Sequence, residues 1–400
     1  MRRLYKNAQL VLAPDEVSGE GFLCDQDGVI QRVELRAGRL DFDSILEKEQ
    51  KLCDEVNDCL GDYLAPGLID IHCHGALERD TMEATFDAFD QILNFHATGG
   101  ATLVVLTTVA ARFEEMQSVL DAAQSYRQER KSSRLAGIHL EGPYFSPQRR
   151  GAHRLEMLRH PAQKETQVIL QYASVISRMT LAPELPGALE LISNLVQRGI
   201  TMSAGHSDAT KQEAGAGFEA GISQVTHLYN SMSSLHSNGG QRFTGLAEAA
   251  LTTPGILCEV IADARHLSPT LLRLAWLAKG WAGVVIVTDA TAGAGMPEGS
   301  LFQLGGLPCR IEQGMAWTGE GKNRRLAGST IGMIDGVRVM VEEAKVPLNE
   351  AVAMATLVPA QALGLEESRG SLAPGKRSDL LRFSPDWQVL GLWSGGAKIV

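Results

Sequence analysis

The sequence lacks three features that would each point to a different class of protein: an excess of positive charge, a long apolar run and closely paired cysteines. Its 400 residues carry 37 Lys and Arg against 47 Asp and Glu, for a formal net charge of −10. This sign argues against nucleic acid or an anionic membrane surface as the main partner. The longest apolar stretches, such as residues 284–287, are far shorter than the roughly 20 residues that cross a bilayer.

Cysteine usage and the N-terminus point to the same compartment. The six cysteines, at positions 24, 53, 59, 73, 258 and 309, contain no CxxC pair and are unevenly spaced. This usage is typical of reduced thiols and not of a disulfide-rich secreted domain. Residues 1–17 hold two arginines but only a broken apolar run, which makes a poor secretory signal. We therefore expect a cytoplasmic protein with the composition of an ordinary soluble enzyme.

The two ends of the chain differ from its middle in their sequence pattern. Residues 1–62 contain short β-like runs broken by turns, and the segment from about residue 370 onward repeats that pattern. Two β-rich ends that flank a different middle suggest one small domain assembled from both termini. We therefore expect residues 1–62 and 366–400 to form the two parts of a small β-sandwich domain. Residues 63–365 would form the catalytic domain.

The middle of the chain alternates apolar runs with segments of helical periodicity. The runs read LIDIHCH, TLVVLTT, LAGIHLEG, RMTLAPE, ITMSAGH, QVTHLYN, LCEVIAD and VVIVTDA. Between most of them, apolar residues recur three and four positions apart, as in PGALELISNLVQRG, although the helix after QVTHLYN is indistinct. Strands that alternate with helices indicate a parallel sheet. Eight such strands match the α/β architecture of a (β/α)8 TIM-type barrel, which takes about 250 residues.

Polar side chains gather where these predicted strands end. In a TIM-type barrel the active site forms at that face. His72 and His74 are two positions apart in a strand, so both can point into the mouth of the barrel. The series of strand-end residues is His72, His74, Thr107, Thr108, Glu141, Glu184, His206, His227, Asp263 and Asp289.

Imidazole and carboxylate groups together suit zinc, iron and other borderline divalent ions. Glu141 is placed to bridge two such ions, with His206 and His227 completing the second. Asp289, the last of the series, is placed to act as a base on a water molecule at the metal. A single strand-end histidine is more often a hydrogen-bonding residue than a ligand. Four histidines and two acids, each ending a different predicted strand except for the first pair, nevertheless predict a metal site.

Several longer motifs surround these residues in a fixed order. They are APGLIDIHCHG, GIHLEGPYFSPQRRGAH, LAPE, SAGHSDAT, THLYNSM, IADARHLSP, VTDATAGAG, LAGSTIGMIDGVR and GSLAPGKRSDL, between about residues 60 and 385. Together they resemble the amidohydrolase superfamily and, within it, the N-acetylglucosamine-6-phosphate deacetylases. The histidine pair and the strand-end aspartate alone would support only the superfamily, and the other motifs narrow the resemblance.

This resemblance implies a metal-bearing barrel with a small β-sandwich domain, a homodimer, and removal of an N-acetyl group to give acetate and an amino sugar phosphate. It assigns Glu141, His206 and His227 to the metal that all members hold. Some members lack the first histidine pair and bind one ion, whereas this chain keeps His72 and His74 and would hold two. The divalent ion would be zinc, with Fe2+ or another ion as the alternative. Asp289 aligns with the acid that shuttles the proton.

The resemblance also implies substrate contacts, several of which depart from the family pattern. Ala152 and His153 match the pair that reaches the sugar, and the loop 326–328 matches a main-chain contact. The other implied contacts lie around the phosphate. Asn230 and Ser231 are two of them, and the family usually has alanine in place of Ser231. Arg242 is another, at a position where the family usually reads REPG. The last is His266, which follows Ala264 and Arg265, where the family usually has glycine and an apolar residue. The main-chain contact loop consists of Leu326, Ala327 and Gly328.

Two other polar segments have simpler interpretations. Glu184 is expected to form hydrogen bonds within the mouth of the barrel and not to bind metal. The basic run KNRR at 322–325 is expected to be a solvated turn, as short charge runs usually are.

Two alternative functions stay open at this point. The chain could hydrolyse another amide, such as an N-acyl amino acid or a cyclic amide. Many of those enzymes carry a carboxylated lysine at the bridging position, where this sequence has Glu141. The chain could instead be a barrel that serves as a non-catalytic scaffold, although such proteins generally lose ligands or the catalytic acid.

Overall fold

The computed structural model describes residues 1–130 and 134–400. Contacts within the chain divide it into two compact units, which we describe separately. One unit comprises Met1–Ile69, His96–Leu103 and Gly332–Val400, and the other comprises Asp70–Phe95 and Val104–Ile331. No helix in the described part of the chain combines the length and apolar character that a membrane crossing requires.

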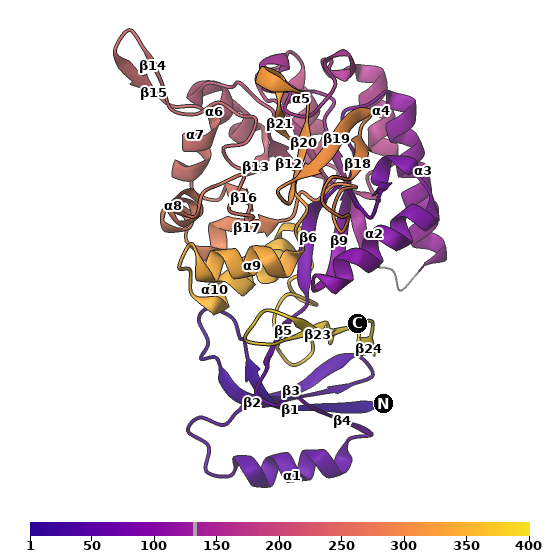
Figure 1. The fold of residues 1–400 in the computed structure, drawn as a ribbon, viewed down its shortest axis with the longest axis vertical. Coiled ribbons are helices and arrows are strands. Elements are labelled where there is room, and N and C mark those ends of the chain that lie inside the picture. The colour runs from indigo at the N-terminus through magenta and orange to yellow at the C-terminus, as the bar shows by residue number, and fades with distance from the viewer. Residues whose placement is uncertain (131–133) are drawn as a thin grey trace. The chain divides into compact units, whose positions relative to one another are not determined.

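The first unit is built on an eight-stranded sheet that combines both ends of the chain (Figure 1). The strand order is β24-β23-β22-β5-β1-β2-β3, and β4 pairs with β1. Antiparallel pairing of β5 with β22 places Pro66 opposite Leu380. The strands are β1 (Arg2–Leu10), β2 (Gly19–Gln26), β3 (Val29–Leu35), β4 (Glu55–Asp58), β5 (Tyr63–Pro66), β22 (Leu380–Phe383), β23 (Val389–Ser394) and β24 (Ala397–Lys398).

Successive residues of β1 face two different cores, as the two-residue period of a strand requires. Leu4 packs with Phe22 and with Phe42 of helix α1 (Phe42–Leu52). Tyr5 packs on the other face, where its ring meets Trp393 edge-on with the centroids 5.1 Å apart. The unit also contains the helices α9 (Met333–Glu342), α10 (Leu348–Met354) and α11 (Leu357–Ala362).

The second sheet has eight strands in the order β17-β16-β13-β12-β11-β10-β9-β6. A parallel bridge between Cys73 and Ala290 joins its first and last members beyond the strand ends, and the Asp289 N–H donates to the His72 carbonyl at 2.9 Å. The sheet is thereby nearly closed, which confirms the predicted (β/α)8 TIM-type barrel and a separate β-rich part. Its strands are β6 (Leu68–Cys73), β9 (Ala101–Thr107), β10 (Leu135–Glu141), β11 (Ile176–Leu181), β12 (Thr201–Ala204), β13 (Ile222–Val225), β16 (Leu257–Ile261) and β17 (Val284–Val287).

Helices follow the successive barrel strands, which explains the two alternating periods in the sequence. The helix after β13 is short and begins only after a hairpin of β14 (His236–Asn238) and β15 (Gln241–Phe243), so its sequence signal is indistinct. Figure 1 shows this hairpin reaching away from the barrel strands. The helices are α2 (Phe86–Thr98), α3 (Phe113–Glu129), α4 (Gln163–Gln171), α5 (Ala188–Val196), α6 (Lys211–Ala220), α7 (Leu246–Thr252) and α8 (Pro269–Lys279).

A four-stranded antiparallel sheet that the sequence pattern does not predict follows β17. Its order is β18-β19-β20-β21, and β21 leads directly into the segment 326–328. A smaller ribbon of β7 (Gly75–Ala76) and β8 (Arg79–Asp80) follows β6. The strands of the four-stranded sheet are β18 (Leu301–Leu304), β19 (Leu307–Glu312), β20 (Met315–Thr318) and β21 (Arg325–Leu326).

Candidate active site

The predicted ligand and catalytic side chains come from five barrel strands and meet at one end of the barrel. Two of them belong to β6 and the residue just beyond it, and one is the last residue of β10. The others lie two residues past the ends of β12, β13 and β17. All are buried, and they are His72, His74, Glu141, His206, His227 and Asp289.

Three of these residues leave their strands with an unusual backbone conformation. His206, His227 and Asp289 have φ angles of +48°, +32° and +48°. Residues other than glycine rarely adopt positive φ, and such strain is found where the surrounding structure holds a functional side chain in place. The three strained residues are thus ones whose side chains meet in the mouth of the barrel.

The first group of donor atoms surrounds the histidine pair. The Nε2 atom of His74 lies 3.2 Å from Oε2 of Glu141 and 3.3 Å from Oδ1 of Asp289. The Nε2 atom of His72 lies 3.4 Å from the same aspartate oxygen and 3.4 Å from Nε2 of His74. Four side chains thus point their donor atoms at one small volume.

The second group shares Glu141 with the first. Its Oε1 atom lies 3.2 Å from Nε2 of His227 and 3.4 Å from Nε2 of His206. The two histidine Nε2 atoms are 3.1 Å apart. Glu141 therefore presents Oε2 to His74 and Oε1 to His206 and His227, and Nε2 of His72 lies 3.6 Å from Oε1.

These separations fit divalent ions. Zinc binds nitrogen and oxygen ligands at about 2.0–2.1 Å, and tetrahedral geometry then separates the ligand atoms by about 3.3 Å. Distances of 3.1–3.4 Å between donors in both groups match that spacing. The residues present are thus suited to one ion in each group, with Glu141 between them.

The electrostatics of the site favour positive charge beside the carboxylates of Glu141 and Asp289. Burial raises the pKa of Glu141, but neighbouring His72 and hydrogen bonds from other histidines hold it well below its ordinary value. Burial lowers the pKa of His74, yet Asp289 and Glu141 raise it to about 9. Burial and nearby His153 lower the pKa of His206 to about 4, so its ring is neutral, as a ligand must be. A divalent ion would replace protons held by this negative charge.

Two of the ligand rings have a fixed tautomer. The Nδ1 atom of His206 lies 2.9 Å from the Arg149 carbonyl oxygen, which can only accept a hydrogen bond. The Nδ1 atom of His72 lies 3.1 Å from the Glu259 carboxylate. Both rings therefore carry their proton on Nδ1 and turn the Nε2 lone pair to the centre, as metal ligation requires.

His153 reaches the same centre with the opposite tautomer. The backbone N–H of Ala110 donates to its Nδ1 atom at 3.2 Å, so the ring proton lies on Nε2, which is 3.6 Å from the Glu141 carboxylate. A protonated Nε2 can donate a hydrogen bond but cannot bind an ion. This geometry suits contact with a substrate oxygen, the role predicted for His153, and not a further metal ligand.

A cavity of 260 Å3 opens onto these groups. Apolar walls come from Val109, Ile261 and Leu304. A larger cavity of 810 Å3, with Glu78 and Phe302 in its wall, contains none of the six strand-end groups. Of the predicted substrate-binding residues, those that line the smaller cavity are Ala152, His153, Asn230, Ser231, His266, Leu326 and Gly328.

Two glycines allow the main chain to approach the site closely. A Cβ atom on Gly151 would lie 2.6 Å from Oγ of Ser231 and 2.7 Å from Cε1 of His206. A Cβ atom on Gly328 would lie 2.5 Å from the Asp289 carbonyl oxygen. Both have positive φ, so glycine is required by space and by conformation. Ala327, which precedes Gly328, is buried and donates its N–H to the Ala316 carbonyl of the four-stranded sheet at 3.0 Å.

His266 is held at the cavity by Asp263. Its Nδ1 atom lies 2.7 Å from the Asp263 carboxylate, whose other oxygen accepts the backbone N–H groups of Arg265 and His266 at 2.8 Å. Asp263, which the sequence places among the strand-end acids, therefore orients a histidine and lies outside both donor groups. Ala264 has a φ of +57°, a conformation that glycine adopts without steric cost.

The predicted phosphate contacts are only partly assembled within one chain. The Asn230 N–H already donates to the His227 carbonyl at 2.9 Å, and its Nδ2 donates to the Leu228 carbonyl at 3.2 Å. Arg242 is exposed on the β14–β15 hairpin, where it pairs with Ser237, and it does not line the cavity. Except for Arg242, every predicted site residue therefore lines the cavity or, in the case of His72 and Ala327, lies next to a residue that does.

Sequence reasoning missed two residues of the site. Arg325, expected in a solvated turn, lines the cavity and donates Nη1 to the Gly151 carbonyl at 2.9 Å. Its three predecessors in the basic run are exposed, so only its place at the start of β21 distinguishes it. Glu259 touches His72 from behind, and a glutamate within the apolar run LCEVIAD was the signal that could have revealed it.

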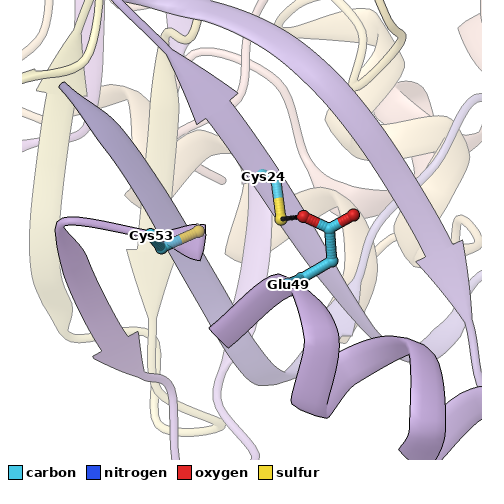
Figure 2. Close-up of side chains that lie close together, drawn as sticks. All are labelled: Cys24, Glu49 and Cys53. Carbon is cyan, nitrogen blue, oxygen red and sulfur yellow. Dashed lines mark hydrogen bonds between the residues drawn. The ribbon is translucent and has the colours of Figure 1, made fainter. Parts of the chain in front are cut away.

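A further group of metal-type side chains lies in the β-rich unit (Figure 2). Donor atoms of Cys24, Glu49 and Cys53 lie within 4.8 Å of one another. Burial raises the pKa of both thiols, so they stay protonated and are poor ligands. The Glu49 carboxylate already pairs with Arg2 and Arg32. This group therefore serves the packing of α1 on the sheet.

Comparison with known proteins shows the family to which this chain is similar. The model of the amidohydrolase family matches residues 63–397. The N-acetylglucosamine-6-phosphate deacetylase of Vibrio furnissii is 34% identical over 84% of this chain and 82% of its own length. The N-acetylgalactosamine-6-phosphate deacetylase of Escherichia coli O157:H7 is 34% identical over 88% of this chain and 92% of its own. A crystal structure of N-acetylglucosamine-6-phosphate deacetylase from Pasteurella multocida superposes with a TM-score of 0.88 at 28% identity, covering 100% of this chain and 99% of that one.

Proposed function

This chain belongs to the amidohydrolase family, and we propose that it hydrolyses the acetamide of an N-acetylhexosamine 6-phosphate. N-acetylglucosamine-6-phosphate is the first candidate, and the products are acetate and the amino sugar phosphate. The observation that carries the proposal is the convergence of His74, His206, His227, Glu141 and Asp289 on one cavity that His153 also enters, with His72 directly behind them. The names of its relatives and of its structural neighbours support the choice of substrate.

We further infer that the site holds two divalent ions, with zinc as the first candidate. His72, His74, Glu141 and Asp289 would hold one, and Glu141, His206 and His227 the other. Such ions supply two effects when bound: they make hydroxide available at neutral pH and polarise the amide carbonyl. The remaining steps belong to side chains of this chain.

Asp289 is suited to move the proton. Its main chain is fixed on both sides, because its N–H donates to the His72 carbonyl at 2.9 Å and its carbonyl accepts the Ser329 N–H at 2.7 Å. Burial raises the pKa of its carboxyl, but His72 and His74 hold it below the ordinary value, so the group is ionised and ready to accept a proton. It takes the proton from the attacking water and returns it to the amine, because an unprotonated amide nitrogen is a poor leaving group.

His153 and His266 position the substrate. The Nε2–H of His153 donates to a substrate oxygen beside Glu141. The Nε2 atom of His266 faces the cavity because Asp263 holds Nδ1 on the other side of the ring. A charge-assisted hydrogen bond from this ring to the phosphate would fix the sugar and leave the amide near the ions.

The proposed substrate class can be tested by measuring acetate release. The panel comprises N-acetylglucosamine-6-phosphate, N-acetylgalactosamine-6-phosphate, unphosphorylated N-acetylglucosamine and an N-acetyl amino acid, each with and without chelator. We expect a phosphorylated sugar to be preferred in kcat/KM by roughly 100-fold or more, because a site built for a charged group rejects analogues that lack it. Equal turnover of the unphosphorylated sugar, or preference for the amino acid, would contradict the proposal.

We propose that the protein is a homodimer in the cytoplasm and that Arg242 reaches the phosphate bound by its partner. The exposed hairpin, whose His236 and Phe243 rings stack with centroids 5.6 Å apart, supports this arrangement. Free thiols at positions 24, 53, 59, 73, 258 and 309 suit a reducing compartment.

Mixing two impaired variants, assayed at a substrate concentration well below the KM of the unchanged protein, tests the shared site. Arg242→Met should raise KM for the phosphorylated sugar by about tenfold or more, and Asp289→Asn should lack turnover. A hybrid dimer contains one site with both Asp289 and an intact partner arginine, so mixing the variants after dissociation should restore a measurable fraction of activity. A monomer by analytical ultracentrifugation, or no recovery in verified hybrids, would contradict the arrangement.

A further inference from the structure

An ion pair lies in the interior of the barrel, beneath the metal-type ligands. Glu259 in the middle of β16 is 0% exposed, and Arg178 of β11 is 1% exposed. Their side chains form an ion pair with each other. Barrel interiors are usually filled by branched apolar side chains, and two buried charges cost desolvation that their attraction repays only partly. A role in the site would explain their presence.

The contacts of Glu259 connect it to both donor groups. Its Oε2 atom lies 3.1 Å from Nδ1 of His72 and 3.3 Å from the backbone N of His227. Its other oxygen faces Arg178. Glu259 contacts Nδ1 of His72, whereas Nε2 of the same ring faces His74 and Asp289, and Glu259 does not line the cavity, so it acts on this ligand from behind.

The other ligand histidines have weaker support behind their rings. The Nδ1 atom of His206 meets only a main-chain carbonyl. Among the described residues, the Nδ1 atoms of His74 and His227 have no hydrogen-bond partner. A carboxylate behind an imidazole fixes its tautomer and increases its basicity more than a neutral acceptor does. His72 is therefore the best-prepared ligand of the first group, where its neighbour His74 is not supported.

We propose that Glu259 is a positioning residue that holds His72 as an Nε2 ligand and thereby decides whether the first of the two ions is retained, with Arg178 supplying the counter-charge. The inference rests on the two-ion site proposed above. Arg178 is itself fixed by weak contacts, with Nη1 3.4 Å from the Ile71 carbonyl and Nη2 3.5 Å from Oγ1 of Thr226. The ion pair thus links β11 and β16, and through Glu259 it fixes the orientation of the His72 ring.

Zinc stoichiometry of the purified protein tests the proposal. Equilibrium dialysis against buffered Zn2+, followed by mass spectrometry, should give two ions per chain for the unchanged protein. Glu259→Gln should weaken one ion by about 10–100-fold and leave the other unchanged. Nitrogen NMR of the histidine rings should show that His72 no longer keeps its proton on Nδ1, because the introduced side-chain amide turns its oxygen to Arg178 and its NH2 to His72.

A second variant separates positioning from folding. Glu259→Gln leaves Arg178 buried without a counter-charge, which can unfold a protein. The double variant Glu259→Leu with Arg178→Met removes both charges and the acceptor behind His72. We expect it to fold and to lose the same ion. Ser203→Ala is a matched control, since Ser203 lies in the same polar interior, bonds Thr226 at 2.6 Å and touches no ligand ring.

The outcomes distinguish this inference from the proposed function. Two ions at unchanged affinity in both Glu259 variants would overturn the positioning role and leave the two-ion site standing. A single ion in the unchanged protein would overturn both. Loss of the ion in Ser203→Ala as well would show that any disturbance of the interior has this effect, which also overturns the specific role of Glu259.

Discussion

Replacing Asp289 by asparagine is expected to lower kcat by about 10^3-fold, within the range typical of losing a general acid–base group. Asparagine has the same shape and keeps the main-chain hydrogen bonds to His72 and Ser329, so the variant should fold. Its amide cannot take a proton from water or return one to the amine. Acetate release from N-acetylglucosamine-6-phosphate, measured at saturating substrate, checks the expected loss.

Zinc content and thermal unfolding must accompany that measurement. Both should stay near the values of the unchanged protein, because the histidines and Glu141 remain in place and asparagine keeps an oxygen where Oδ1 of Asp289 lies. Asp121→Asn serves as the matched control. Asp121 lies on the outer helix α3, accepts a hydrogen bond from the Tyr172 hydroxyl and does not line the cavity. A kcat for Asp289→Asn within tenfold of the control would refute the proton-shuttling role.

The barrel and the polar side chains that meet at its mouth could be predicted because both are local patterns. Each apolar run with a polar end, such as ITMSAGH, indicates a strand and the end of that strand at which the polar side chain lies. Closure of the sheet then brings the ends of β6, β10, β12, β13 and β17 to one place. No knowledge of distant contacts is needed for that step, since the barrel topology supplies them.

The remaining features depend on contacts between distant segments. The donor role of His153 follows from the Ala110 N–H, and the support of His72 follows from Glu259. Neither partner is visible in the residues around the histidine. Arg325 reaches the cavity because β21 belongs to a sheet built after β17, and its short strands alternate too briefly to give a clear signal. The proposed phosphate contacts were the least predictable, because Arg242 lies on an exposed hairpin and does not line the cavity.

The substitution Glu141→Gln is expected to remove both ions at once and to reduce acetate release by about 10^3-fold or more. Each carboxylate oxygen of Glu141 serves one donor group: Oε2 lies 3.2 Å from Nε2 of His74, and Oε1 lies 3.2 Å from Nε2 of His227. An amide has only one such oxygen, and its NH2 would donate to a histidine lone pair that an ion needs. Chelated wild-type protein should recover activity on addition of Zn2+, whereas the variant should not.

Glu184→Gln provides the control from the same end of the barrel. Glu184 accepts hydrogen bonds from Oγ of Ser207 at 2.7 Å and from the Asp208 N–H at 2.6 Å, as its expected hydrogen-bonding role requires, and it belongs to neither donor group. The Glu184→Gln variant should retain two ions. The three glutamates therefore give a graded result, in which glutamine at position 184 loses no ion, at position 259 loses one and at position 141 loses two. Retention of two ions by Glu141→Gln would show that the histidine pairs bind without a bridge, and the shared-carboxylate geometry would then have no functional meaning.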